Sequence, residues 1–173
     1  MFLDLNTIRT ARDHFEKVYA SEALSTDSDA FRVVAPVALA FDVAKDKQHF
    51  QLTGSVKTTL ELICSRCLEP FTLEVDAPFD LRYQPHASNT GEDEREIEED
   101  DLSTAFYEDQ RIDLGQLMRE QFYLAVPMKP LCRELCQGLC PVCGTNLNRG
   151  SCDCTRDWED PRMAGLKALK RES

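Results

Sequence analysis

The sequence predicts an α+β fold: an antiparallel β-meander, or a partly closed β-barrel, with one packed helix and a C-terminal knuckle built on four cysteines. Three observations lead to this class. Residues 31–83 alternate apolar and polar side chains, as half-buried strands do. Residues 112–127 repeat apolar side chains with a helical period. Six of the eight cysteines lie within the 23 residues from Cys132 to Cys154.

The first segment, residues 1–30, is predicted to be helical. Its apolar side chains between residues 6 and 20 recur with an approximately helical period: Ile8, Ala11, Phe15, Val18 and Tyr19. Asn6 and Thr7 precede most of them, and both residue types are suited to cap a helix N-terminus. The sequence therefore predicts an N-terminal helical segment ahead of the sheet.

Residues 31–83 are predicted to form three or four long antiparallel strands. Apolar residues alternate in VALAFDVA, the stretch AKDKQ has the composition of a turn, and HFQLTGSVKTTLELI is rich in residues that favour strands. Gly54 interrupts that stretch and indicates a bulge or a break. The pattern resumes in PFTLEVDAPFDLRY, so CSRCLEP lies at the turn that joins two strands.

Residues 84–111 are predicted to form an irregular acidic insertion. The run EDEREIEEDD, residues 92–101, contains eight acidic residues and one arginine. It therefore accounts for most of the net charge of −11 of the whole chain. Such a run is typical of a solvated loop rather than of a packed element.

A helix is predicted over residues 112–127, with Asp113 as its N-cap and Pro127 at its end. Residues 128–173 hold the cysteine-rich segment. They are predicted to finish in a short C-terminal helix that begins near Pro161.

The cysteines come in close pairs, an arrangement that lets two sulfurs face one metal ion. CPVCG has the form of a zinc knuckle, because Gly144 can take the positive φ angle that a tight turn requires. CDC supplies a further pair across the turn-rich loop GTNLNRGS. The spacing predicts that residues 128–173 contain a four-cysteine zinc knuckle with these ligands: Cys140, Cys143, Cys152 and Cys154.

The two remaining pairs, CSRC and CRELC, allow a second zinc site. This site would connect the turn between two strands to the segment after the predicted helix. Its ligands would be Cys64, Cys67, Cys132 and Cys136. Sequence alone does not bring these pairs together, and other pairings of the four couples stay open. Four thiolates leave no position for water on the metal, so both sites are predicted to be structural rather than catalytic.

A thiol–disulfide oxidoreductase is the alternative function. CSRC or CPVC would then be a dithiol active site, and Arg66 would lower a thiol pKa. Such dithiols usually open a helix after a strand, whereas CLEPF has the pattern of the next strand. The sequence contains no phosphate-binding loop and no dinucleotide motif, and its three histidines lie outside any motif. Other catalytic constellations are thus absent, and we expect no small-molecule substrate.

The N-terminus has no secretory signal pattern, and the longest apolar run, VVAPVALAF, is too short to span a membrane. We expect a cytoplasmic location, or the equivalent compartment of an organelle, and no membrane partner. Disulfides rarely persist there, which favours metal binding for the cysteines. The acidic excess disfavours a surface that grips nucleic acid through phosphates alone.

Four blocks of the chain resemble the YceD family, the large ribosomal RNA subunit accumulation proteins. These blocks are CSRCLEPF, IDLGQLMREQFYLAVPMKPLC, GLCPVCGTNLNRGSCDC and DPRMAGLKALK, and they occur in the order of the family. The resemblance implies a non-enzymatic role in ribosome biogenesis, through which large-subunit ribosomal RNA accumulates.

The partner that this role implies is a ribosomal protein or large-subunit ribosomal RNA. Ribosomal proteins are strongly cationic, so the acidity of the chain favours a protein partner over naked RNA. Direct contact with RNA would have to use residues near the knuckle: Arg133, Arg149, Arg156 and Arg162, with Trp158 stacking on a base.

Overall fold

The structure is a computed structural model and describes residues 1–24, 30–85 and 104–154. Within these ranges the protein is mostly β-sheet with one α-helix, as an α+β fold requires. The strands are β1 (Phe2–Asp4), β2 (Arg12–Tyr19), β3 (Arg32–Val33), β4 (Val37–Asp46), β5 (His49–Ile63), β6 (Pro70–Pro85), β7 (Thr104–Tyr107) and β8 (Arg111–Asp113). The helices are the 3₁₀ turns η1 (Leu5–Thr7) and η2 (Ser21–Ala23) and the α-helix α1 (Leu114–Ala125).

The larger sheet has the strand order β2-β4-β5-β6-β7, and β3 also pairs with β5. Strands β4, β5 and β6 form the predicted antiparallel meander, whereas β7 runs parallel to β6. The path does not return on itself, so among the described residues the sheet is open and the barrel alternative is wrong. A second, two-stranded sheet pairs β1 with β8.

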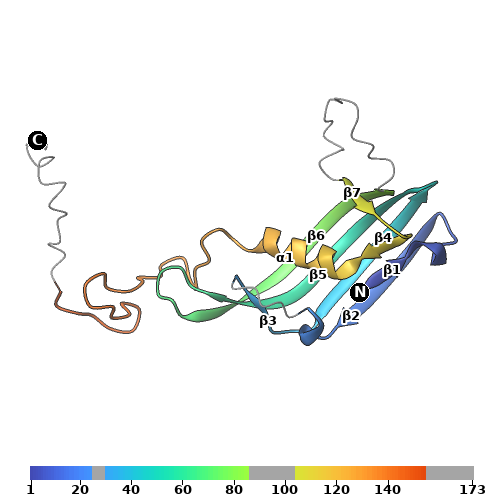
Figure 1. Cartoon of the computed structure of the whole chain (residues 1–173). Helices are drawn as coiled ribbons and strands as arrows, with labels where there is room; N and C mark the ends of the chain where they lie inside the picture. The colour runs from blue at the N-terminus through green and yellow to red at the C-terminus, as the bar shows by residue number, and fades with distance from the viewer. Residues whose placement is uncertain (25–29, 86–103, 155–173) are drawn as a thin grey trace, which may run out of the picture.

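The β5–β6 hairpin is longer than the strands beside it. Its ladder runs from the Phe50–Tyr83 pair to the Ile63–Pro70 pair. On the other side of β5, β4 reaches only Lys57, and β3 pairs only with Leu60 and Glu61. The hairpin tip therefore extends beyond its neighbours, and Figure 1 shows the chain after α1 lying beside this tip.

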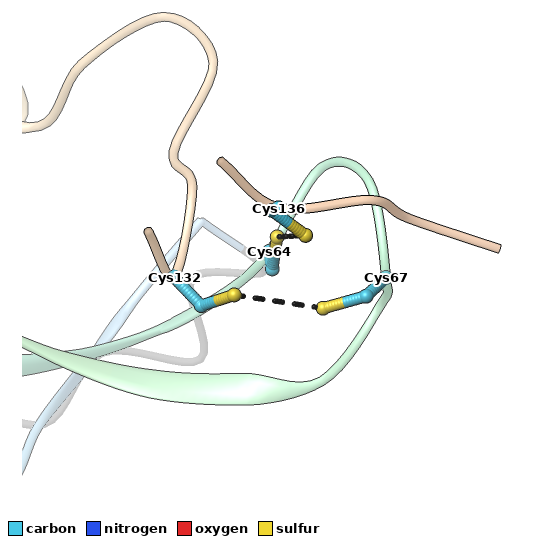
Figure 2. Close-up of side chains that lie close together, drawn as sticks. All are labelled: Cys64, Cys67, Cys132 and Cys136. Atoms are coloured by element: carbon cyan, nitrogen blue, oxygen red, sulfur yellow. Dashed lines mark hydrogen bonds between the residues drawn. The ribbon is translucent and has the colours of Figure 1, made fainter. Parts of the chain in front are cut away.

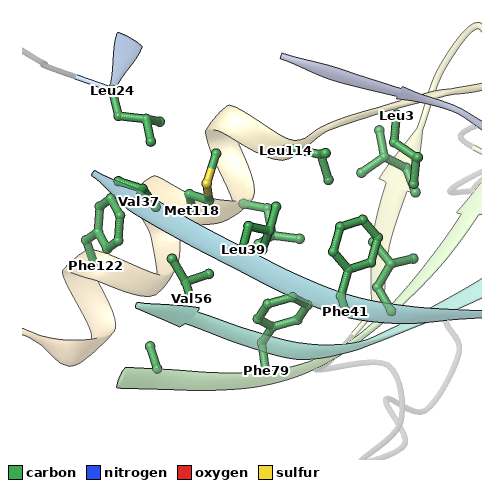
Figure 3. Close-up of a cluster of buried hydrophobic side chains, with 14 of the residues drawn as sticks. Leu3, Leu24, Val37, Leu39, Phe41, Val56, Phe79, Leu114, Met118 and Phe122 are labelled. Atoms are coloured by element: carbon green, nitrogen blue, oxygen red, sulfur yellow. The ribbon is translucent and has the colours of Figure 1, made fainter. Parts of the chain in front are cut away.

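Helix α1 lies across one face of the sheet and closes the core (Figure 1). Its residues Leu114, Met118 and Phe122 are fully buried, and they face strand residues such as Leu39 and Val56 (Figure 3). The structure has one packed helix where one was predicted, but it is shorter than the predicted 112–127, because Arg111–Asp113 form strand β8. The Asp113 carboxylate accepts hydrogen bonds from the backbone N–H groups of Gly115 at 2.8 Å and Gln116 at 3.2 Å.

The predicted N-terminal helix is wrong, because residues 12–19 form strand β2 and pair with β4. The apolar residues of this stretch are aromatic or β-branched, and these types favour a pleated surface. Phe15 stacks on Phe41 across the pair with ring centroids 5.3 Å apart, whereas Val18 faces solvent. Pairing with a neighbouring strand thus overrides a weak helical period. Asp4, rather than Asn6 or Thr7, caps the short turn η1.

The predicted acidic insertion is too long at both ends. Strand β6 continues to Pro85, and residues 104–113 contain β7 and β8. Tyr107 is buried there, because its ring packs against Phe50 and its hydroxyl donates to the Gln48 carbonyl at 3.0 Å. The acidic run 92–101 and the predicted C-terminal helix lie outside the described residues. No helix within the described ranges is long and apolar enough to cross a membrane.

Gly54 is a close-packing site rather than the predicted bulge or break, since β5 pairs continuously on both sides of it. A Cβ atom at this position would meet the Ala40 carbonyl oxygen and Phe41 Cβ. We predict that Gly54→Ala lowers the free energy of unfolding by about 2–3 kcal/mol, as overpacking of a core does. Urea denaturation at a fixed zinc concentration measures this. Ser55→Ala is the matched control, and an equal loss in both variants would contradict the prediction.

Candidate metal centres

The β5–β6 turn folds as a knuckle around the first pair of cysteines. The Cys64 N–H donates to the Glu69 carbonyl at 2.9 Å, and the Leu68 N–H donates to the Cys64 carbonyl at 3.0 Å. Leu68 has a φ angle of 58°, in the left-handed region that non-glycine residues rarely adopt. This tight turn places the Cys64 and Cys67 sulfurs on one side of the hairpin tip.

CPVCG repeats the same backbone arrangement 76 positions later. The Cys140 N–H donates to the Thr145 carbonyl at 2.8 Å, and the Gly144 N–H donates to the Cys140 carbonyl at 2.9 Å. Gly144 has a φ angle of 74° and occupies the place that Leu68 takes in the first turn. The two CxxC turns are therefore the same local structure. Only the second has glycine, the residue that adopts a left-handed φ angle most easily, at the left-handed position.

The first cysteine cluster joins two distant parts of the chain. It consists of Cys64 and Cys67 from the hairpin tip and Cys132 and Cys136 from the segment after α1, with all sulfurs within 4.8 Å of one another. The Sγ atoms of Cys64 and Cys136 lie 3.8 Å apart, and those of Cys67 and Cys132 lie 3.7 Å apart (Figure 2). Three of the four residues are buried.

The second cluster is local and more accessible to solvent. Its four sulfurs, from Cys140, Cys143, Cys152 and Cys154, also lie within 4.8 Å of one another. Cys143 is exposed, and both cysteines of the CDC pair are partly exposed. The structure thus groups the eight cysteines into the same two sets of four that the spacing suggested. Their role as metal ligands stays a prediction.

The geometry of the first cluster fits zinc. A tetrahedral site with zinc–sulfur bonds of about 2.3 Å places its sulfurs about 3.8 Å apart. Two of the sulfur–sulfur separations, 3.7 and 3.8 Å, match this edge length. Nitrogen donors also lie near sulfurs of both clusters: the Asn148 side-chain amide lies 3.3 Å from Cys136 Sγ in the first, and the Val142 N–H lies 3.4 Å from Cys140 Sγ in the second. Such donors stabilise thiolates and fix their orientation.

Each cluster lowers the pKa of two thiols and raises the pKa of the other two. Burial opposes ionisation of Cys64, but the backbone N–H groups of Cys67, Cys132 and Arg66 outweigh it and lower the pKa of the thiol to about 6. In contrast, desolvation raises the pKa of Cys132 to about 12. A bound divalent cation would lower the pKa of the thiols that are otherwise raised, because its charge lets neighbouring sulfurs ionise together.

The second cluster shows the same division. The Thr145 hydroxyl lies 3.1 Å from Cys143 Sγ, and it is the main cause that lowers the pKa of this thiol to about 6. Hydrogen bonding to Cys143 raises the pKa of Cys154 to about 12. Four soft sulfur donors, two of them with a lowered pKa, are therefore suited to zinc in both clusters.

Main-chain contacts hold the cysteine segment on the hairpin tip. The Ser65 N–H donates to the Pro130 carbonyl at 2.8 Å, and the Leu139 N–H donates to the Arg66 carbonyl at 3.1 Å. The Arg66 guanidinium donates to the Cys136 carbonyl at 3.0 Å. Gly138 has a φ angle of 72°, and a Cβ there would lie 3.0 Å from the Arg66 carbonyl oxygen. Glycine is thus required where the two segments meet.

The arginines predicted to bind a partner have contacts within the molecule. Arg149 forms an ion pair with Glu69 at 2.6 Å, and Arg133 donates to the Asn148 side-chain carbonyl at 2.6 Å. Both contacts fasten the cysteine segment. Arg156, Trp158 and Arg162 lie outside the described residues. Sequence analysis missed Asn148 and gave Arg66 only a redox role; the position of Arg66 inside CSRC is the signal that could have identified its structural role.

The geometry does not give either CxxC pair the setting that a dithiol active site usually has. Cys64–Cys67 lies in a β-hairpin turn and Cys140–Cys143 in a short turn, so neither pair opens a helix. Both pairs also have two further sulfurs within 4.8 Å. This arrangement favours a shared metal ion over a dithiol that exchanges with a substrate.

Comparison with known proteins places the chain in a family. The family model described as "Large ribosomal RNA subunit accumulation protein YceD" matches residues 52–170. The chain belongs to the YceD family. Within the described residues the matched stretch contains most of β5, all of β6 and α1, and both cysteine clusters. No solved structure matches the chain.

Two plant relatives in the YceD family carry the name "Large ribosomal RNA subunit accumulation protein YCED homolog 1, chloroplastic". The protein from Zea mays is 30% identical over 176 residues, which cover 83% of this chain and 56% of the relative. The protein from Arabidopsis thaliana is 28% identical over 158 residues, which cover 79% and 49%. An uncharacterized protein of Mycobacterium tuberculosis is 34% identical over 96 residues, which cover 56% and 44%. The chain thus spans about half the length of the curated relatives it matches.

We predict that the protein purified without chelator holds about two zinc ions, one for each cluster. Cys136→Ser and Cys152→Ser should each leave about one ion, because three thiolates hold zinc much more weakly than four. Elemental analysis by mass spectrometry measures the content. Ser65→Ala, beside the first cluster, is the matched control and should keep both ions. Full zinc content in Cys136→Ser would contradict the assignment of this cluster.

The two knuckles also predict opposite effects of glycine. Leu68 is 62% exposed, so Leu68→Gly loses little packing while it relieves the left-handed strain. We expect this variant to raise the free energy of unfolding by up to about 1 kcal/mol. Gly144→Ala, at the equivalent position, should lower it by about 1 kcal/mol. Urea denaturation at fixed zinc measures both, and a destabilised Leu68→Gly would contradict the strain argument.

Proposed function

We propose that this protein is a non-enzymatic ribosome-biogenesis factor that promotes the accumulation of large-subunit ribosomal RNA. The observation that carries the proposal is the extent of the family match, which includes the long hairpin, α1 and all eight cysteines. The plant relatives that align over most of this chain bear the same functional name. The protein would act by binding, with its surface held in shape by structural zinc.

Zinc would be held by the first cluster, Cys64, Cys67, Cys132 and Cys136, and by the second, Cys140, Cys143, Cys152 and Cys154. When bound in such four-thiolate sites, zinc supplies folding free energy, about 10 kcal/mol or more in isolated peptides. The segment after α1 has few large apolar residues, and Leu135 and Val142 are exposed. It therefore cannot be held in place by burial alone. All four ligand positions are taken by cysteine, so the sites support a structural role and leave no open position for catalysis.

We propose a ribosomal protein, rather than bare RNA, as the direct partner. The hairpin tip and the described cysteine segment carry four basic residues: Arg66, Lys129, Arg133 and Arg149. They also carry three acidic residues, Glu69, Glu134 and Asp153. Each zinc site with four thiolates adds two negative charges. This end of the molecule would then be net negative, which favours a cationic protein over phosphates.

The proposal places the protein where large-subunit ribosomal RNA is assembled, in the cytoplasm or in the corresponding compartment of an organelle. It includes no membrane partner and no small-molecule substrate.

Cells that lack the protein test this proposal. We expect reduced large-subunit ribosomal RNA relative to small-subunit RNA, restored by the wild-type gene. Cys136→Ser should restore little, because it removes a ligand from the cluster that joins the hairpin to the cysteine segment. Ser65→Ala should restore the RNA fully. Quantification of both RNAs on a gel measures the result. An unchanged RNA ratio in cells without the protein would refute the proposed function.

A further inference from the structure

The edge of strand β6 is open over most of its length. Strand β7 pairs only with residues 82–85, so within the described part of the chain no strand pairs with residues 70–81 on that side. An unpaired edge offers a row of backbone N–H and C=O groups to another extended chain. Pro70 and Pro78 interrupt this row, and the seven residues between them form its longest stretch without proline.

A groove of about 430 Å³ runs between this edge and α1. Its floor is apolar, with Leu73, Val75 and Ala77 from β6 and Ala125 from α1. Leu124 also lines the groove and is 79% exposed, although it belongs to the helix that closes the core. The groove therefore offers pockets for apolar side chains directly beside the open edge.

Gln121 gives the groove a polar group. The residue is only 6% exposed, and it lines the groove from α1. A primary amide presents both a donor and an acceptor, which are the two groups that a peptide backbone needs. Gln121 is thus suited to pair with the main chain of a strand that lies on β6.

The acidic residues that line the groove indicate which kind of chain would bind there. Glu74 and Asp76 line the groove, and Glu74 has no ion pair within the described residues. Asp76 lies 2.8 Å from Lys57, but both side chains are about 60% exposed, so this pair is weak. A second copy that paired antiparallel about Val75 would place Glu74 opposite Asp76, and a nucleic acid would bring phosphates to both carboxylates. A strand that carries lysine or arginine would compensate both carboxylates.

We infer that the β6 edge and its groove bind an extended, lysine- or arginine-rich polypeptide segment by strand addition. Apolar residues on one face of that segment enter the groove, its cations meet Glu74 and Asp76, and its backbone pairs with β6 and Gln121. The inference rests on the proposed function for the identity of the partner, since ribosomal proteins are cationic. The binding surface itself rests on the geometry alone.

A fluorescent nine-residue peptide that alternates lysine and valine tests this inference, added to the full-length, zinc-loaded protein. We expect binding by fluorescence anisotropy at low salt, weakened at high salt. Glu74→Lys and Leu124→Asp should each weaken binding about tenfold or more. Glu16→Lys, on strand β2 at the opposite edge of the sheet, is the matched control and should change binding less than twofold. Hydrogen exchange of residues 71–77 should slow when the peptide binds.

Gln121→Leu separates a binding role from a structural one. Leucine is close to glutamine in volume, so this variant should keep about the stability of the wild type, yet it should bind the peptide several-fold more weakly. Unchanged peptide affinity in Gln121→Leu, Glu74→Lys and Leu124→Asp would overturn the inference. Binding of a uridine oligonucleotide that the peptide displaces would overturn it in favour of RNA.

The RNA assay distinguishes this inference from the proposed function. If Glu74→Lys and Leu124→Asp, the edge variants, lose peptide binding and also fail to restore ribosomal RNA, both the groove inference and the proposed function are supported. If edge variants restore the RNA while Cys136→Ser does not, the groove inference fails and the proposed function stands. If the wild type has no effect on ribosomal RNA, the proposed function fails, and peptide binding still decides the groove.

Discussion

The pairing between β5 and β6 is the interaction on which the rest of the structure depends. Its ladder outruns both β4 and β3, so it carries Cys64 and Cys67 beyond the ends of the neighbouring strands. The inner face of the same hairpin packs against α1. Because α1 is fixed on the sheet, the chain that leaves it reaches the hairpin tip with Cys132 and Cys136. One hairpin thus positions the core and the first cluster together.

The two cysteine clusters share their chemistry but differ in what they connect. The first joins residues 65 and 72 positions apart, whereas the second closes one short segment. Long connections cost more chain entropy to close than short ones. The first cluster therefore couples the cysteine segment to the fold of the sheet, and the second shapes only the segment itself. Gly138 lies between them, at the point where the segment contacts the Arg66 backbone.

The charged residues near the clusters serve mainly to hold the structure together. Arg66 donates to the Cys136 carbonyl, and Arg149 pairs with Glu69 across the two segments. Cations used in this way contribute little to a basic surface. On the sheet, Glu74 lies beside an unpaired edge and lines the same groove as Gln121. The features on the sheet that can meet a partner are thus acidic or polar, while the described arginines near the clusters, Arg66, Arg133 and Arg149, have contacts within the molecule.

Local patterns in the sequence were sufficient to predict the meander from β4 to β6, the cap and end of α1, and the pairing of cysteines into CxxC turns. These features depend on residues close in the chain: alternation along a strand, Asp113 at a helix start and the glycine that follows Cys143. The helix predicted over residues 6–20 is wrong because residues 12–19 pair with β4 as strand β2. The contacts of that pairing outweigh the weak helical period of the apolar residues. The open edge of β6, the groove that Gln121 lines beside it and the meeting of Cys64 with Cys136 were decided by tertiary structure alone. Each depends on which distant segments lie side by side. Local sequence patterns do not reveal this, because such contacts form, and contribute free energy, only in the folded chain.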